Sequence, residues 1–185
     1  MRIAVYSGSF DPLHIGHQAI MEHLSREPGF DWVYLVISPQ NPFKDPAKAL
    51  SAERRYKEAV EAVRRHPDLH VRVDDIELGM EPPHYTIRTL DELRRREPGN
   101  EFTLVIGADN LENIHGWRDF PRILREYGVA VYPRNGYDLA RTSRLLLGED
   151  SGYNIQIIDA PLVDISSTQI REALTRGEDV SRLLM

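Results

Sequence analysis

The chain opens with a short apolar run that ends in a glycine-containing loop carrying two histidines. The run covers residues 2–6, and the loop begins at Gly8. From His14 onward, apolar residues recur at helical spacing, which predicts a strand, a turn and then a helix. A buried strand that leads through a glycine loop into a helix is typical of an α/β fold with a parallel sheet. The apolar positions of the predicted helix are Ile15, Ala19, Ile20 and Leu24.

Strand patterns alternate with helix patterns along the rest of the chain. Tyr56, Ala59, Val60 and Val63 lie on one helical face, and Ile87, Leu90 and Leu93 on another. The alternation predicts a Rossmann-like doubly wound parallel sheet, and 185 residues fit a single domain over residues 1–185. Segments rich in Pro and polar residues at 39–49, 79–85 and 133–138 predict loops beside a ligand crevice. Further strands are predicted at 32–38, 69–73, 101–106, 129–132 and 155–158.

The charge balance argues against a nucleic-acid partner. Asp and Glu number 29 against 23 Lys and Arg, a formal charge of −6, so no broad basic surface is available to hold a polyanion. A small phosphorylated ligand needs only a few local cations and N–H groups. The absence of cysteine excludes thiolate metal sites and thiol nucleophiles. With no apolar segment long enough for a membrane span or a secretory signal, we expect a cytoplasmic protein without a membrane partner, and leave a homo-oligomer open.

The first loop has the features of a phosphate-binding site. Gly8 permits close approach of the backbone, and the following helix start offers unpaired N–H groups and the positive end of its dipole. His14 and His17 are three residues apart, so both imidazoles are expected on one helical face. Gly16 between them leaves no side chain in the way of a nucleotide. Ordinary helix-start histidines are the alternative, but the combination favours a site in which both imidazoles contact phosphates.

A second helix start near the other end of the chain has matching features. Ile165, Ser166, Ser167 and Thr168 precede a helix whose first turn carries Arg171. Hydroxyl residues can cap such a helix while their N–H groups face an anion, and Arg171 can return to the same place. Capping alone would also account for one or two of the hydroxyls. Two phosphate-binding helix starts are what a triphosphate site requires.

These two motifs resemble the T/H-x-G-H and ISSTxxR signatures of the nucleotidyltransferase superfamily. Within it, most of the chain is similar to the bacterial nicotinate-nucleotide adenylyltransferases. The matching pieces are Ser38-Pro39-Gln40-Asn41-Pro42-Phe43-Lys44, Pro83-His84-Tyr85-Thr86 with Thr89-Leu90, Ile106-Gly107-Ala108-Asp109-Asn110, and Trp117.

The resemblance implies roles for individual residues. It places Gly8, Ser9, Phe10, Gly16, Gly107, Asp109, Arg134 and Ile165 to Thr168 on the ATP side. Trp117 is expected to stack on the pyridine ring, and Gln40 and the backbone near Thr86, Ile87 and Arg118 to hold nicotinate mononucleotide. Core packing is the alternative for Trp117, helix capping for Asp109 and simple solvation for Lys44.

The implied reaction needs no catalytic base, because the attacking 5′-phosphate of nicotinate mononucleotide is already an anion. Catalysis then consists of positioning two polyanions and stabilising charge on the α-phosphate of ATP. We expect His14, His17, Lys44 and Arg171 to supply a positive field, with Mg²⁺ held mainly by the ATP phosphates.

Four alternatives use the same residues differently. Pantetheine-phosphate adenylyltransferase has both motifs, but its usual chain is shorter and lacks the segment from Gly107 to Asn110 with Trp117. A nicotinamide-mononucleotide adenylyltransferase is the alternative that differs in the acceptor. A class I aminoacyl-tRNA synthetase shares the His-x-Gly-His element, but it pairs that element with a lysine-rich loop, whereas Ile165 to Arg171 stand in its place here. A nucleotide-sensing module without catalysis is expected to lose a phosphate ligand.

Overall fold

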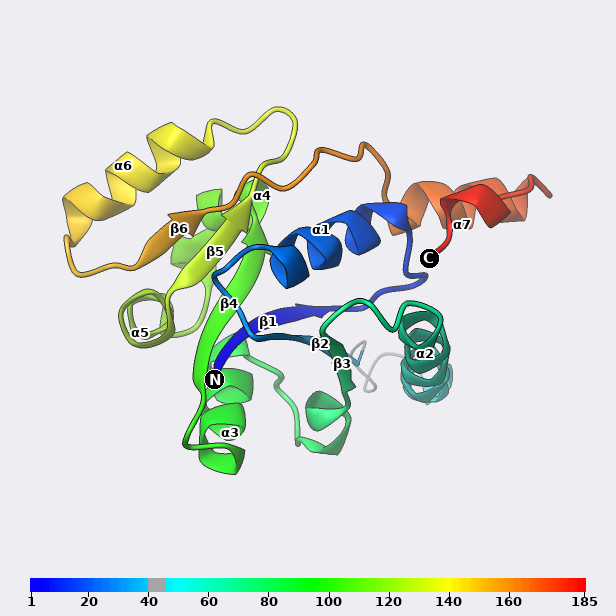
Figure 1. Cartoon of the computed structure of the whole chain (residues 1–185), viewed down its shortest axis with the longest axis horizontal. Coiled ribbons are helices and arrows are strands. Elements are labelled where there is room, and N and C mark those ends of the chain that lie inside the picture. Colours follow the sequence, from blue (N-terminus) through cyan, green and yellow to red (C-terminus); the bar gives the residue numbers. More distant parts are fainter. Residues whose placement is uncertain (40–45) are drawn as a thin grey trace.

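The computed structural model describes residues 1–39 and 46–185, in which six parallel strands form one sheet with the order β3-β2-β1-β4-β5-β6 (Figure 1). The strands are β1 (Arg2–Gly8), β2 (Trp32–Ile37), β3 (Val71–Asp74), β4 (Glu101–Gly107), β5 (Val129–Tyr132) and β6 (Ile155–Ile157). The helices are α1 (Ile15–Arg26), α2 (Pro46–Arg64), α3 (Thr86–Arg96), α4 (Ala108–Glu112), α5 (Phe120–Arg122), α6 (Leu139–Glu149) and α7 (Ser167–Thr175), with shorter helical turns at Ile76–Gly79, Ile114–Gly116, Ile123–Tyr127 and Ser181–Leu183.

The strand order reverses direction between β1 and β4. The chain builds β1, β2 and β3 outward to one side, then returns to place β4, β5 and β6 on the other. This is the predicted doubly wound parallel sheet, which the structure confirms. In such sheets ligands bind in the crevice outside the carboxyl ends of the strands, at the point of reversal. The loops after β1 and β4 border that crevice.

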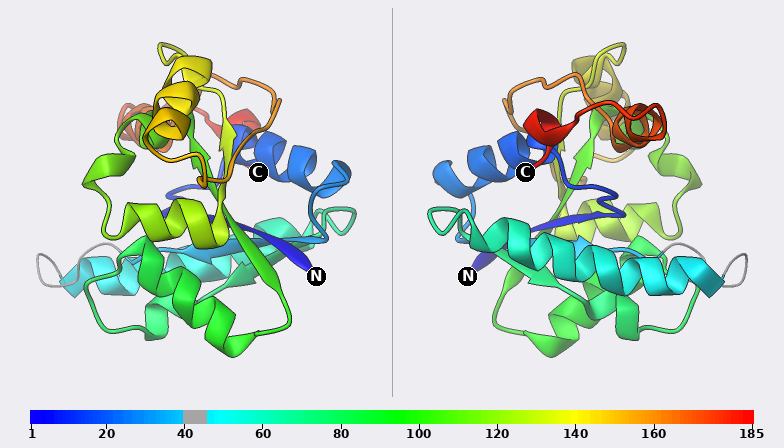
Figure 2. Two further views of the ribbon diagram at one scale, coloured as in Figure 1. Left: turned by 90° about the vertical axis from the view of Figure 1, so that its left-hand side faces the viewer. Right: turned by 90° about the vertical axis from the view of Figure 1, so that its right-hand side faces the viewer.

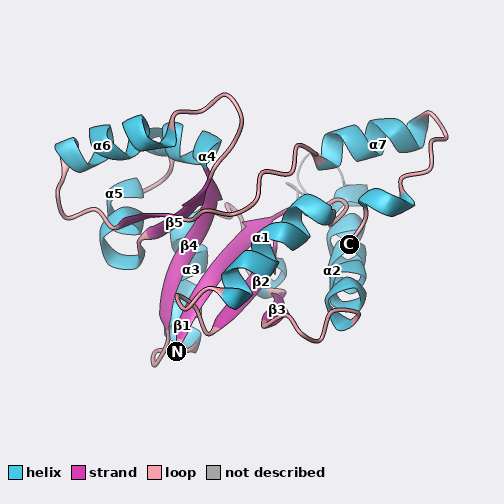
Figure 3. Cartoon of the chain, turned by 45° about the horizontal axis from the view of Figure 1, so that its top comes forward, coloured by secondary structure: helices cyan, strands magenta, loops and turns pink. Residues whose placement is uncertain are grey.

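Helices cover both faces of the sheet (Figures 2 and 3). On one face α1 and α2 bury residues such as Leu24 and Ala59 against the strands. On the other, α3, α4 and α6 bury residues such as Leu90 and Leu111. Complete burial of one such leucine contributes about 1.5–3 kcal/mol, so these two apolar layers fix the strand ends in place.

Two predicted boundaries need correction, and one helix was not predicted. The loop predicted over 39–49 is too long, because α2 already begins at Pro46, a residue whose fixed φ suits the first helical turn. The strand predicted over 69–73 spans Val71–Asp74. The sequence patterns gave no sign of α6, since exposed Leu145 and Leu147 obscure its apolar face. Within residues 1–39 and 46–185, no helix is both long and apolar enough to span a membrane.

Candidate functional site

The loop after β1 lies beside the C-terminal segment that carries α7 (Figure 1). Ser167 Oγ donates a hydrogen bond to the Pro12 carbonyl at 3.0 Å, and Arg171 Nη1 donates to the Asp11 carbonyl at 2.6 Å. Leu184 forms an isolated antiparallel bridge with His14. The two motifs, which lie some 150 residues apart in the sequence, therefore share one site, as predicted.

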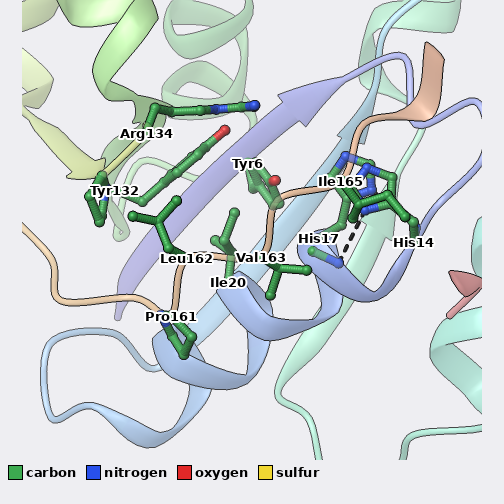
Figure 4. Close-up of a pocket in the computed structure, with 12 residues that line it drawn as sticks. Tyr6, His14, His17, Ile20, Tyr132, Arg134, Pro161, Leu162, Val163 and Ile165 are labelled. Atoms are coloured by element: carbon green, nitrogen blue, oxygen red, sulfur yellow. Dashed lines mark hydrogen bonds between the residues drawn. The ribbon is translucent and has the colours of Figure 1, made fainter. Parts of the chain in front are cut away.

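A cleft opens between the start of α1, the end of β5 and the segment that leads into α7 (Figure 4). It is bordered by polar and aromatic groups on one side and by aliphatic side chains from Pro161 to Ile165 on the other. The polar and aromatic lining residues are Tyr6, His14, His17, Tyr132 and Arg134.

Backbone hydrogen bonds hold both imidazoles of the cleft. His14 is the N-cap of α1, and its Nδ1 accepts from the N–H of Gly16 at 3.1 Å. His17 Nδ1 accepts in turn from the N–H of His14, also at 3.1 Å. The rings stack with their centroids 3.6 Å apart. Because a backbone N–H can only donate, each Nδ1 is unprotonated and each neutral ring carries its proton on Nε2.

Burial also keeps both rings neutral. It lowers the pKa of His14 to about 4, with the nearby Arg134 charge adding to the effect. Burial lowers the pKa of His17 to about 2, with further contributions from His14 and Arg134. The predicted positive field from the two imidazoles is therefore wrong. They can act as neutral Nε2–H donors, and Arg134 supplies positive charge in the lining of the cleft.

Packing within the protein also requires a glycine at Gly16. A Cβ at this position would lie 2.9 Å from His14 Cε1 and 3.3 Å from Ile165 Cγ2. The glycine therefore makes room for the imidazole and for the segment before α7, and its predicted role toward a nucleotide stays a prediction. This close packing couples the two motifs.

The loop after β1 supports the site through the side chain of Phe10. Phe10 is buried, and its ring packs edge-on against His17 and over Gly8, where a Cβ would be 3.2 Å from Phe10 Cζ. The Ser9 carbonyl accepts a hydrogen bond from Arg55. The side chain of Phe10 is thus part of the core and holds the His17 ring in position.

The start of α7 uses most of its hydroxyls internally. Ser166 caps the helix through its bond with the N–H of Gln169, and Ser167 Oγ is engaged with Pro12. Arg171, predicted to face phosphate, has its guanidinium on the Asp11 carbonyl and on Thr168 Oγ1. In the described residues, the N–H groups of Ser167 and Thr168 have no acceptor, which leaves them for an anion.

A third group of predicted residues gathers after β4 and β5. Arg134 Nε lies 3.6 Å from Asp109 Oδ1, and a Cβ on Gly107 would lie 2.5 Å from that same oxygen. The N-cap of α4 is Gly107, and Asp109 lies within the first turn, so the capping alternative is wrong. Its Oδ1 is buried without a hydrogen-bond partner among the described residues. An unpaired buried carboxylate oxygen next to an arginine is an acceptor for a ligand hydroxyl.

The residues predicted for the second substrate come from two segments that touch. The Arg118 guanidinium lies over the Tyr85 ring at 4.8 Å, and its Nη2 donates to the Tyr85 hydroxyl at 3.4 Å. Thr86 begins α3, while the Ile87 side chain is buried, so only its backbone is available. Trp117 is half-buried against the core. Gln40 and Lys44 lie outside the described residues.

Two tyrosines of the cleft were missed by the sequence analysis. Tyr6 and Tyr132 lie near the ends of β1 and β5, and both line the cleft beside the imidazoles. Burial raises the pKa of Tyr6 well above its usual value, with a further contribution from Tyr132. Their positions at the carboxyl ends of predicted strands were the available signal. In the part of the chain that the structure describes, no cluster of three or more His, Asp or Glu side chains could hold a metal ion.

Comparisons with known proteins identify the family of this chain. The family model described as cytidylyltransferase-like matches residues 5–173. A probable nicotinate-nucleotide adenylyltransferase of Flavobacterium johnsoniae is 34% identical over 184 residues, covering 100% of this chain and 92% of the relative. Another from Bacteroides fragilis is 37% identical over 183 residues, covering 99% of this chain and 87% of that protein.

A solved structure supports the fold. Nicotinic acid mononucleotide adenylyltransferase of Plasmodium falciparum, complexed with NaAD, matches with a TM-score of 0.76 at 17% identity, covering 99% of this chain and 90% of that one. The sequence relatives over the full length and the solved structure with the same fold agree. The chain belongs to the cytidylyltransferase-like family and, within it, to the nicotinate-nucleotide adenylyltransferases.

Proposed function

We propose that the protein transfers the AMP part of ATP to nicotinate mononucleotide and releases pyrophosphate. The 5′-phosphate oxygen of the acceptor attacks the α-phosphorus of ATP and forms a new P–O bond. The bond from the α-phosphorus to the bridging oxygen breaks, and its electron pair leaves with pyrophosphate. The observation that carries the proposal is the meeting of the imidazole pair and the α7 start at one cleft.

In this proposal the protein donates hydrogen bonds to the phosphates and holds the two substrates in position. The Nε2–H groups of His14 and His17, together with the free N–H groups of Ser167 and Thr168, bind phosphate oxygens. Arg134 and Asp109 take the adenosine end. Arg171 orients the loop through the Asp11 carbonyl. Mg²⁺ enters with the substrate as MgATP, coordinated by phosphate oxygens and water.

The acceptor site is proposed where Tyr85 and Arg118 meet. Backbone groups near Thr86, Ile87 and Arg118 receive the nicotinate carboxylate, and Trp117 stacks on the pyridine ring. Gln40 remains a proposed contact to the acceptor, and Lys44 a proposed contact to the transferring phosphate.

A pyrophosphate-release assay with MgATP and three acceptors tests the proposal. The expected kcat/KM is highest with nicotinate mononucleotide and lower with nicotinamide mononucleotide, with no turnover of phosphopantetheine. Binding of ATP without release of pyrophosphate for any acceptor would indicate a nucleotide sensor. Fastest turnover of another acceptor would reassign the second substrate.

A further inference from the structure

The side chain of Arg55 in α2 is buried beside the loop after β1. Only 2% of the residue is exposed to solvent. Arg55 Nη1 donates to the Ser9 carbonyl at 2.5 Å and to the Ser38 carbonyl at 3.0 Å. One guanidinium nitrogen therefore ties the loop after β1 to the end of β2.

The other nitrogens of this guanidinium are not satisfied. Nε and Nη2 are buried and have no hydrogen-bond partner in the described residues. A buried cation with unpaired donors weakens the folded state, and an apolar side chain in its place would avoid that cost. Stability alone is thus a poor explanation for an arginine at this position.

The loop that Arg55 holds is anchored at most of its carbonyl groups. Donors from outside the loop occupy these carbonyls, so their oxygens are already hydrogen-bonded and the path of the loop backbone is fixed. The anchored pairs are the Gly8 carbonyl with Ser38 N–H, Ser9 with Arg55, Asp11 with Arg171, Pro12 with Ser167 and Leu13 with Met185 N–H.

We propose that Arg55 is a positioning residue for adenylyl transfer, which fixes the loop after β1 against the end of β2. The inference rests on the proposed function. Arg55 does not contact substrate; it sets the spacing between the segment that holds the ATP phosphates and the neighbouring strand end. Misplacement of reacting groups by about 1 Å can cost roughly 10²-fold in rate.

The test compares Arg55→Met and Arg55→Lys with the control Arg54→Met, whose guanidinium is exposed and paired with Glu58 on the same helix. Measured quantities are kcat, the Kd for ATP and the melting temperature. We expect Arg55→Met to lower kcat by about tenfold or more, with less than about a threefold change in Kd, because the phosphate donors remain. Arg55→Lys should recover only part of the kcat, since the shorter lysine side chain cannot keep both hydrogen bonds of Nη1. Arg54→Met should match the parent within about twofold.

The outcomes separate this inference from the proposed function. Failure of the parent enzyme to release pyrophosphate with any acceptor would defeat the proposed function and this inference with it. A working parent with parental kcat in Arg55→Met would defeat the inference alone, even if the melting temperature falls. Should Arg55→Met fail to fold, Arg55→Lys decides: reduced kcat with unchanged Kd supports the role, and parental kcat overturns it.

Discussion

His17 Nδ1 accepts a hydrogen bond from the backbone N–H of His14 at 3.1 Å, so the helix cap holds this imidazole before any ligand arrives. This arrangement is a capping box in which histidine takes the place usually held by Glu or Gln. It leaves Nε2–H as the atom of His17 that can reach substrate. The cap and the substrate contact therefore depend on different atoms of the same ring.

Replacing His17 by Asn separates these two roles. The Asn amide oxygen can accept the His14 N–H as Nδ1 does, but nothing replaces the Nε2 donor. We expect kcat/KM to fall by ~10²–10³, the typical cost of removing one transition-state donor. The melting temperature should stay near that of the parent because the cap is kept. Steady-state kinetics and thermal unfolding check both, and parental kcat/KM would remove His17 from the proposed site.

The lowered pKa values of the two histidines predict a pH dependence of stability. In the unfolded chain the imidazoles bind protons near pH 6.5, whereas in the folded protein His14 does so only near pH 4 and His17 near pH 2. The unfolded state thus binds more protons below pH 6.5, and the free energy of unfolding falls as pH drops toward 4.

Urea unfolding at pH 7.0 and pH 4.5 measures this effect. The parent should lose more stability between the two pH values than His17→Asn, which lacks one of the titrating groups. Carboxylate titrations are common to both proteins and cancel in the difference. An equal loss in the two proteins would mean that burial does not depress the pKa of His17.

Gly107 provides a test of the adenosine end of the site. A methyl group there would lie 2.5 Å from Asp109 Oδ1 and 3.2 Å from Arg134 Nε, so both side chains must move. We expect Gly107→Ala to raise the KM for ATP by roughly tenfold or more, since small misplacements are costly. Gly148→Ala is the matched control, because its Cβ meets nothing within 4 Å and the residue lies in α6. The control should keep parental kinetics and gain up to about 1 kcal/mol of stability.

Arg96 is expected to matter for stability alone. Its guanidinium contacts Asp74, whose side chain is only 1% exposed, at 2.5 and 3.1 Å. Arg72 remains 3.3 Å from the same carboxylate. Arg96→Met should therefore lower the free energy of unfolding by about 2–3 kcal/mol, less than the ~3–5 kcal/mol typical when a buried charge loses its only partner.

Arg95→Met is the control for that change, since its pair with Glu92 is exposed and solvent-screened and should leave stability nearly unchanged. Both variants should keep the parental kcat/KM at temperatures where they are folded. A loss of activity in folded Arg96→Met would show that Asp74 and Arg96 affect the site directly.

The sequence predicted the sheet because it follows from local patterns, whereas the juxtaposition of the two motifs was predicted from their resemblance to the superfamily signatures. Strand and helix periods are read within short windows, and a βα junction places its loop at the crevice of a parallel sheet. The charge state of His14 and His17 was out of reach. It depends on burial and on which backbone N–H each ring accepts, and neither is written in the spacing of the two residues.

The hydrogen-bond partners of Arg55 and Arg171 could not be predicted from the sequence either. A helix position indicated that Arg171 lies near the site, but its engagement with the Asp11 carbonyl follows from a loop 160 residues away. Arg55 looked like one more charged residue beside Arg54 on α2. Only the packing of α2 against the sheet reveals that one of the two guanidinium groups is buried and the other exposed.

In the proposed binding mode, one triphosphate lies between the start of α1 and the start of α7. This binding mode can be seen in a crystal structure with an ATP analogue that carries a methylene group between the α- and β-phosphates. We predict phosphate oxygens within about 3.2 Å of the Nε2 atoms of His14 and His17 and of the N–H groups of Ser167 and Thr168. Phosphates of the analogue that lie away from both helix starts would rule out this binding mode.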